Sequence, residues 1–238
     1  MFPYDPIISA AIQNPPQTIP AVLAAMQTID ATCVDIDGLK WFNWLYLAVT
    51  GAVATGVNAG GFADPAWLAQ LDVQFASLYF RALSASLAGQ PCPGCWNAVF
   101  SVRNNARLGR IQFALAGINA HINHDLCQAI VATSKATNTV PQHGSPQYSD
   151  YTSLNATLDG LIQQAKTTLN VRLPGDPLPA VSSLENTIAA WSVSAARETA
   201  WKFAEQLWYL PAPLAGGLLD GIDGFTTVIG QALLAPIP

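Results

Sequence analysis

Two of the three histidines in this 238-residue chain lie three positions apart, in the segment GINAHINHDL at residues 117–126. Asp125 directly follows the second of them, so His121, His124 and Asp125 have helical spacings of three and four. Residues at these spacings lie on one face of an α-helix. An imidazole titrates near neutral pH, and a carboxylate beside it can orient it or stabilise its charge. The segment therefore holds groups suited to acid–base catalysis or to metal binding.

Three interpretations of this cluster remain open. The residues can be structural, with the imidazoles and the carboxylate satisfying one another inside a core. Alternatively, His121 or His124 forms an acid–base pair with Asp125. In the third interpretation, His121, His124 and Asp125 ligate a divalent metal such as iron, manganese or zinc. Three ligands from one helical turn crowd the ion, and the Glu-x-x-His pattern of helical di-metal sites does not occur in the chain.

The residues around the cluster indicate that it is buried. The segments IQFALAG before it and CQAIVA after it are apolar on nearly every side. A helix that is hydrophobic all round is a buried helix, and buried imidazoles and carboxylates must be paired. Burial and a charged neighbour can also shift their pKa values into a range useful for catalysis. Gly117 lies on the same stripe and lets a neighbouring helix or a ligand approach.

Polar residues on other apolar helix faces are expected to complete the site. Asp72 shares a helical stripe with apolar residues, and we expect its side chain about 3–6 Å from those of His121 and Asp125. Asn43 lies on a helix nearly free of charge and Asn119 flanks the histidines, so both amides are expected to hold a polar part of a substrate. Solvent exposure is the alternative for Asp72, and an exposed Arg197–Glu198 pair is the alternative for Glu198. The remaining residues expected around the substrate are Tyr46, Tyr79, Glu198 and Trp201.

The composition excludes several classes of protein. The chain is 51% hydrophobic and only 11% charged, against about 25% charged in an ordinary soluble domain. Either much of the surface is therefore uncharged, or part of it is covered by a lipid or another subunit. Cover by a second copy of the chain would make the protein a homo-oligomer. The net charge of −5, with ten scattered basic residues, argues against a nucleic-acid partner. No apolar stretch approaches the roughly 18 residues of a transmembrane segment. The N-terminus, with early prolines and no early positive charge, does not resemble a signal peptide, so we expect a cytoplasmic protein.

The elements that must position the cluster are predicted to be helices, because the sequence shows no convincing alternation of apolar and polar residues of the kind typical of strands. Thr18 and Asp64 are expected N-caps, the latter followed by Pro65 at the first helical position, and a further helix is expected to open at Asp37. We expect a single all-α domain over residues 1–238, a helical bundle of about seven or eight helices. The loops at 138–149 and 170–182 are too short to separate domains. The expected helices cover about 18–30, 37–56, 64–89, 106–136, 149–169 and 182–210, with a weaker one in the apolar Gly/Pro-rich segment 211–238.

The four cysteines are too few for a disulfide framework in a chain of this length. Cys92 and Cys95 form a Cys-x-x-Cys sequence, CPGC, which could be redox-active or half of a zinc site. It begins a loop and has no second copy, so two small residues in a Pro-Gly turn are the favoured interpretation, and a metal site shared with a histidine is the alternative. The segment DGIDG at 220–224 resembles a calcium loop faintly but lacks the other ligands.

Four ordered blocks of the sequence resemble a bacterial and fungal family of domains of unknown function. They are WFNWLYLAVT at 41–50, FADPAWLAQLDVQFASLYF at 62–80, QFALAGINAHINHDL at 112–126 and ARETAW at 196–201. The resemblance covers about residues 40–210 and implies an architecture and a site, but no reaction. It favours Asn43, Asp72, Asn119, His121, Asp125 and Glu198 as site residues. The position of His124 need not be histidine in this family, which weakens a metal site with two histidines, and CPGC is not part of the family pattern.

From these observations we expect an enzyme that acts on a hydrophobic small molecule. His121 would be the acid–base residue, with Asp125 or Asp72 orienting it, and the reaction would be a cyclisation, isomerisation, elimination or hydrolysis. The cofactor stays open between none and a divalent metal. The alternative is a helical small-molecule carrier without catalytic activity, in which the polar cluster only fixes the packing of the helices. The sequence identifies neither the substrate nor the oligomeric state.

Overall fold

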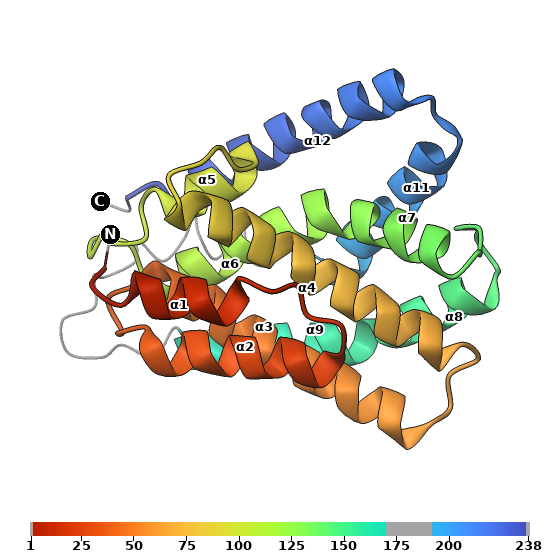
Figure 1. Ribbon diagram of the computed structural model, residues 1–238, viewed down its shortest axis with the longest axis horizontal. Coiled ribbons are helices and arrows are strands. Elements are labelled where there is room, and N and C mark those ends of the chain that lie inside the picture. The colour runs from red at the N-terminus through yellow and green to blue at the C-terminus, as the bar shows by residue number, and fades with distance from the viewer. Residues whose placement is uncertain (1, 170–191, 237–238) are drawn as a thin grey trace.

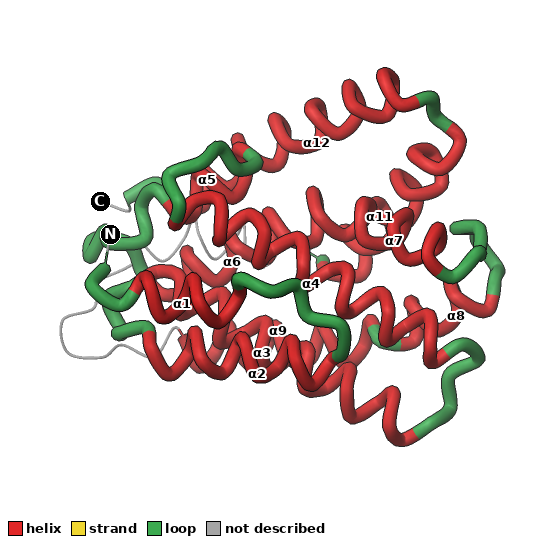
Figure 2. The backbone as a smooth tube through the Cα atoms, in the orientation of Figure 1, coloured by secondary structure: helices red, strands yellow, loops and turns green. Residues whose placement is uncertain are grey.

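The structure is a computed structural model that describes residues 2–169 and 192–236, and in this part of the chain every regular element is helical (Figures 1 and 2). The expected all-α fold is therefore confirmed. No helix in the described ranges is long and apolar enough to span a bilayer. The helices are α1 (Asp5–Ile12), α2 (Ile19–Thr32), α3 (Gly38–Ala59), α4 (Pro65–Leu87), α5 (Gly94–Phe100), α6 (Arg110–Ala120), the π-helical turn η1 (His121–Asp125), α7 (Leu126–Ala136), α8 (Pro146–Ser153), α9 (Asn155–Leu169), α11 (Val193–Tyr209) and α12 (Ala212–Leu233).

The predicted helix starts are confirmed by side-chain caps. Thr18 accepts a hydrogen bond from the Ala21 amide at the start of α2. Asp37 and Asp64 cap α3 and α4 in the same way. These caps satisfy amides that have no partner within the helix. Because a cap is a local feature, its residue type and position could be recognised in the sequence.

The structure divides some expected helices and adds short ones. The helix expected over 149–169 is two helices, α8 and α9, and α8 starts at Pro146 inside the segment expected to be a loop. Two further short helices, α1 and α5, lie in segments for which no helix was predicted. The weak helix expected near the C-terminus is the regular 22-residue α12. The structure does not describe residues 170–191. The expected loop at 170–182 and the first part of the helix expected over 182–210 therefore lie outside the described residues.

The central element of the bundle is the continuous run α6–η1–α7. The α6 portion packs against α3 and α12, whereas the α7 portion packs against α4 and α11. In Figure 1, α12 runs along one edge of the molecule and α1 and α2 along the opposite edge, with α4 and α7 between them. The histidine cluster lies in η1, at the middle of this run, so packed helices surround it.

Close contact between α3 and α6 requires a glycine. A Cβ built at Gly117 would lie 2.4 Å from the ring of Phe42. The prediction that Gly117 admits a close neighbour is therefore confirmed, and the neighbour is an aromatic side chain of α3. Phe42 is itself buried and contacts the rings of Tyr79, Trp96 and His121. The glycine thus allows the aromatic packing around the histidine.

A buried ion pair joins the N-terminal segment to the bundle. The Arg103 guanidinium donates through Nε to Asp37 Oδ1 at 2.9 Å, and its Nη2 contacts Asp37 Oδ2 and, at 2.9 Å, Asp5. Asp37 also accepts from the Tyr4 hydroxyl at 2.9 Å. Several hydrogen bonds to one buried carboxylate offset the cost of removing its charge from water.

Candidate functional site

The histidine cluster lies on a π-bulge, a single turn of π-helix inside a long α-helix. The Leu126 amide donates to the carbonyl of His121, five residues earlier, rather than four as in an α-helix. Such turns are rare and are often found at functional sites. Here the bulge covers His121–Asp125 and includes both histidines and the carboxylate of the predicted cluster.

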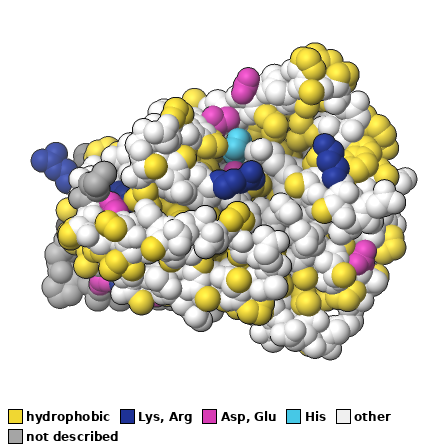
Figure 3. Space-filling model, in the orientation of Figure 1, with side chains coloured by type: hydrophobic (Ala, Val, Ile, Leu, Met, Phe, Trp, Pro, Cys, Tyr) yellow, Lys and Arg dark blue, Asp and Glu magenta, His cyan; other side chains and the backbone are white. Residues whose placement is uncertain are grey.

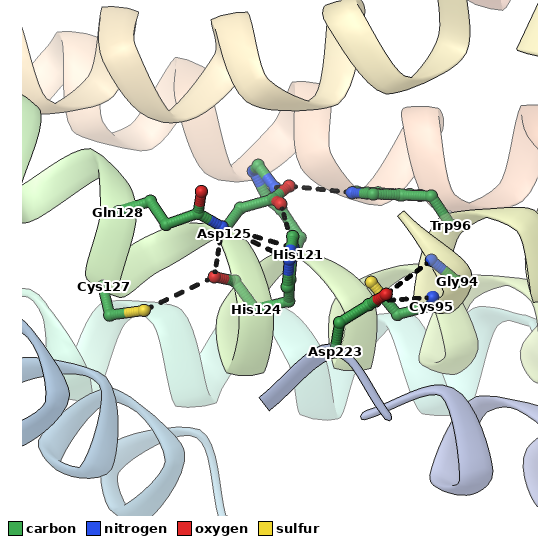
Figure 4. Close-up of polar contacts among 9 residues, drawn as sticks. All are labelled: Gly94, Cys95, Trp96, His121, His124, Asp125, Cys127, Gln128 and Asp223. Carbon is green, nitrogen blue, oxygen red and sulfur yellow. Dashed lines mark hydrogen bonds and ion pairs between the residues drawn. The ribbon is translucent and has the colours of Figure 1, made fainter. Parts of the chain in front are cut away.

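Asp125 bridges the two histidines. Its Oδ2 lies 3.0 Å from His121 Nδ1 and its Oδ1 lies 2.7 Å from His124 Nδ1 (Figure 4). The indole N–H of Trp96 donates to Asp125 Oδ2 at 2.9 Å. All three members of the predicted cluster are buried. The structure therefore brings His121, His124 and Asp125 together, with the carboxylate as the shared partner of the imidazoles.

These contacts shift the three pKa values in different directions. Burial alone would raise the pKa of Asp125, but hydrogen bonds from His121 and His124 outweigh it and hold the pKa below its ordinary value. Burial lowers the pKa of His121, and the hydrogen bond to Asp125 offsets this only in part. For His124 burial also acts to lower the pKa, but the contact with Asp125 outweighs it and the pKa rises. An ionised carboxylate beside a neutral His121 follows from these directions.

Aromatic rings surround His121. Its ring stacks on Phe75 with centroids 3.4 Å apart and contacts Tyr46 at 4.4 Å and Phe42 at 5.6 Å. With Nδ1 bonded to Asp125, the other ring nitrogen, Nε2, is buried and has no hydrogen-bond partner among the described residues. A buried polar atom without a partner is costly, so a native example calls for an explanation such as a ligand or a catalytic role.

A cavity of about 50 Å³ adjoins the His121 ring. Its walls are almost wholly apolar, and a volume of this size accommodates a group of a few atoms, whereas drug-sized ligands occupy pockets of about 300–1,000 Å³. A larger ligand would require the aromatic side chains to move. The wall residues include Phe42, Leu45, Tyr46, Phe75, His121, Ile118, Ile162 and Arg197.

Asp72 is buried, as its apolar stripe predicted. Its Oδ2 has no hydrogen-bond partner in the described part of the chain, and burial raises the pKa of this carboxyl from 3.8 to about 7. The hydroxyls of Tyr46 and Tyr79 are also buried without a hydrogen-bond partner among the described residues. Burial is the main cause that raises the pKa of Tyr46, and the nearby carboxylate of Asp72 raises it further. No hydrogen bond joins Asp72 to His121 or Asp125, so its membership of one shared pocket stays a prediction.

The two asparagines connect helices. Asn43 donates to the carbonyl of Met26 at 2.9 Å and so joins α3 to α2. Asn119 donates to the carbonyl of Thr226 at 2.8 Å, and its side-chain oxygen accepts from Asn123 at 2.9 Å. Neither asparagine lines the cavity beside His121. Both were predicted to hold a substrate, and in the structure each donates a hydrogen bond to a backbone carbonyl of another helix.

Glu198 has its contacts in a different cluster. It accepts from the Tyr148 hydroxyl at 2.8 Å and lies 2.9 Å from His143 Nε2. Arg197 does not form the exposed pair with Glu198 that was the alternative, because it is buried and donates to the Tyr151 carbonyl at 2.6 Å. Glu198 is therefore not among the contacts of His121.

Trp201, which was also predicted to surround the substrate, is buried against aromatic side chains of other helices. Its ring lies 5.8 Å from Trp67 of α4 and 4.9 Å from Tyr151 of α8. Among the predicted aromatic residues, Tyr46 is the one that lines the cavity beside His121.

A second polar group adjoins the bulge and was not predicted as a set. Ligand-type atoms of Cys95, His124 and Asp223 all lie within 4.8 Å of one another. Asp223 Oδ2 accepts from the Gly94 amide at 2.7 Å, and Oδ1 accepts from the Cys95 amide at 2.9 Å (Figure 4). The Cys-x-x-Cys sequence and the aspartates of DGIDG were the only signals of these residues. Among the described residues this is the group that meets the spacing of metal ligands, whereas Asp125 of the predicted set bridges two imidazoles.

Part of this region reaches the surface. Asp223 is half-buried, whereas Cys95 and His124 are buried. The space-filling view shows a histidine with acidic side chains beside it below the position of α12 (Figure 3). CPGC was interpreted as a tight turn that begins a loop, but this is wrong, because Gly94 and Cys95 are the first residues of α5. A Cβ at Gly94 would lie 2.8 Å from Thr227 Oγ1 and 3.1 Å from Asp223 Oδ2. The glycine lets α12 approach the start of α5.

Neither the curated proteins nor the solved structures gave a match to the chain. A family model does match, over residues 19–236, which includes the four sequence blocks and extends beyond them at both ends. It therefore contains the bulge, CPGC and Asp223. The chain belongs to this family, which is described as a family of unknown function (DUF5995).

Proposed function

We propose that the protein is an enzyme that acts on a hydrophobic small molecule, with His121 as its acid–base residue and Asp125 as the partner that orients it. The observation that supports this most is the state of the His121 ring. One nitrogen is bonded to a buried carboxylate at 3.0 Å, and the other is buried with no hydrogen-bond partner in the part of the chain that the structure describes. This is the arrangement of a histidine that exchanges a proton at its second nitrogen.

The roles follow from the hydrogen bonds. With Asp125 ionised, His121 donates from Nδ1 and keeps a lone pair on Nε2. Burial lowers the His121 pKa, which favours the neutral ring that can accept a proton. Once Nε2 is protonated, Asp125 stabilises the imidazolium. The Trp96 indole N–H, 2.9 Å from Asp125, helps to keep the carboxylate in place. Isomerisation, elimination, cyclisation and hydrolysis all use such a proton transfer.

The setting of His121 supports an apolar substrate. The cavity beside the ring has aromatic and aliphatic walls, so an apolar group is the part of a substrate that it would hold. Among the buried polar atoms that have no hydrogen-bond partner in the described residues are Asp72 Oδ2 and the hydroxyl of Tyr46. Both are available to bind a polar atom of the substrate, whereas the Asn119 amide is already bonded at both ends.

The proposal is tested by screening a panel of small apolar esters, ketones and alkenes for stabilisation of the protein and then for turnover. His121→Asn should keep the fold and reduce turnover by about 10²- to 10⁴-fold. His143→Asn is the matched control, since His143 lies on the surface with Glu198 and Glu205, and it should retain wild-type turnover. A His121→Asn protein with full activity would exclude the role given to His121.

A carrier function is the second candidate. It is supported by Asn43 and Asn119, whose hydrogen bonds join helices, as expected if buried polar groups fix the packing. In that case ligands would bind without being converted. His121→Asn would then cost about 1–3 kcal/mol of stability, because a buried partner is left unpaired, and would leave ligand binding in the folded protein intact.

We also propose a cytoplasmic location and a homo-oligomer. All four cysteines are free, which fits a reducing compartment. Exposed apolar side chains on α12, among them Leu214, Phe225 and Val228, support self-association. Light scattering coupled to size-exclusion chromatography would show a single-chain mass if the oligomer does not form.

A further inference from the structure

We infer that Cys95, His124 and Asp223 form a binding site for one divalent metal ion of the zinc class. The three side chains come from three separate elements, α5, η1 and α12. Their ligand-type atoms all lie within 4.8 Å of one another. In a tetrahedral zinc site the ligand atoms are about 3.5 Å apart, given metal–ligand bonds of about 2.0–2.3 Å. Movements of about 1 Å would therefore close the three ligands around an ion.

The chemistry of the three ligands selects the metal. A thiolate, an imidazole and a carboxylate are the ligand types that zinc takes in proteins. Calcium and magnesium prefer oxygen ligands alone. A thiolate and a carboxylate would also neutralise the charge of a divalent ion, which favours binding at a largely buried position. Three protein ligands with a fourth position left for water are typical of catalytic zinc sites.

Hydrogen bonds around the three ligands orient them as second-sphere contacts do in metal sites. Asp125 Oδ1 lies 2.7 Å from His124 Nδ1, so Nε2 is the nitrogen that would bind an ion. The side-chain amide nitrogen of Gln128 lies 3.3 Å from Nε2 and would have to turn away to admit the ion. Imidazole ligands commonly donate their other N–H to a carboxylate in this way. The Gly94 and Cys95 amides hold the Asp223 carboxylate, and each of its oxygens keeps a further lone pair for a metal.

A simpler account of Asp223 is that it only satisfies the two amides at the start of α5. That account, extended by a hydrogen bond from the Cys95 thiol to the same carboxylate, explains the contacts of Asp223. It does not explain why a ring nitrogen of His124 lies within 4.8 Å of both groups. It also does not explain why Asp125 bridges His124 as well as His121. The metal site accounts for both, and it goes beyond the acid–base role proposed for His121, because His121 is not one of its ligands.

The test uses the whole 238-residue chain, stripped with a chelator and then titrated with Zn²⁺ in competition with a chromophoric zinc indicator. We expect about one zinc ion per chain. Cys95→Ser and Asp223→Asn should each weaken zinc binding by at least about 100-fold, and Asp125→Asn, which removes only a positioning residue, by about 10- to 100-fold. With Co²⁺ in place of zinc, the wild type should show a thiolate-to-cobalt charge-transfer band that Cys95→Ser lacks.

Three control variants separate this site from its surroundings. Cys92→Ser removes the other cysteine of CPGC, His143→Ala removes the surface histidine, and His121→Asn removes the acid–base residue. All three should bind zinc with an affinity within about threefold of the wild type. This change is much smaller than the loss of about 10- to 100-fold expected when a second-sphere residue is removed. Retained zinc binding in a His121→Asn protein that has lost turnover would support both proposals independently.

Several results would overturn the site. They are a wild type that takes up no zinc, a cobalt complex without a thiolate band, wild-type affinity in Asp223→Asn, and a loss in Cys92→Ser as large as that in Cys95→Ser. The cobalt spectrum of the wild type keeps the test valid even if a ligand variant does not fold. If zinc binds as expected but His121→Asn keeps full activity, the acid–base proposal fails and the metal site stands.

Discussion

The buried carboxyl of Asp72 should make the stability of this protein depend on pH, and Asp72→Asn should remove that dependence. In the folded protein burial raises the pKa of Asp72 from 3.8 to about 7. Between these two values the native state binds a proton that the unfolded chain has released. The unfolded state then has fewer bound protons, so the free energy of unfolding falls as pH rises. The loss begins near the unfolded pKa and is complete above the folded pKa.

The magnitude follows from the same two pKa values. Each pKa unit corresponds to about 1.4 kcal/mol, so the ionised carboxylate destabilises the native state by about 4 kcal/mol above about pH 7. An amide at this position has no charge to bury. The stability of Asp72→Asn relative to the wild type should therefore increase by roughly 3–4 kcal/mol between about pH 4 and about pH 8. Other titrating groups affect both proteins equally and cancel in this difference.

The assay is urea unfolding of both proteins at a series of pH values, followed by circular dichroism. Asp220→Asn is the matched control, because it removes an exposed carboxylate of α12, and its difference from the wild type should stay within about 0.5 kcal/mol at each pH. A pH-independent difference between Asp72→Asn and the wild type would refute the burial of a carboxyl at this position.

Three further substitutions test the packing and hydrogen bonds by urea unfolding at neutral pH. Gly117→Ala should destabilise the fold by about 1–3 kcal/mol, because the new Cβ meets the Phe42 ring at 2.4 Å; a neutral effect would show that the two helices separate freely. Asp37→Asn should cost about 3–5 kcal/mol, since it leaves the buried Arg103 without its main counter-charge, and a loss below about 1 kcal/mol would contradict this. Trp96→Phe should cost about 1–3 kcal/mol by removing the indole donor to the bridging carboxylate, and unchanged stability would show that another donor replaces it.

Features that depend on neighbours in the sequence were predicted well. The caps at Thr18 and Asp64 and the helix start at Asp37 were recognised because a cap joins residues two or three positions apart. The meeting of His121 with Asp125 follows in the same way from helical spacing. Burial of the cluster followed from apolar residues on all sides of the helix.

Features that depend on distant parts of the chain could not be predicted. Asp223 meets Cys95 across 128 positions, and neither residue lies in a pattern that points to the other. Glu198 shares a helical stripe with Trp201, but its partner His143 comes from a loop 55 positions earlier. Asn119 was expected in a pocket because it flanks the histidines, yet Thr226, far along the chain, supplies the carbonyl that it binds. The packing of α12 against the bundle decides the contacts of Asp223 and Asn119, and the packing of α11 beside the loop before α8 decides that of Glu198.

The π-helical turn also changes how the two halves of the central helix relate to each other. One extra residue in a helix shifts the phase of all later side chains by about 100°. The α6 half can therefore match α3 and α12 while the α7 half matches α4 and α11, although the backbone runs on without a break. Deleting Asn123 from the turn would keep the apolar composition of the helix but bring the two halves back into one phase. One half would then present the wrong face to its neighbours, so the helix carries two separate packing registers that a single deletion would merge.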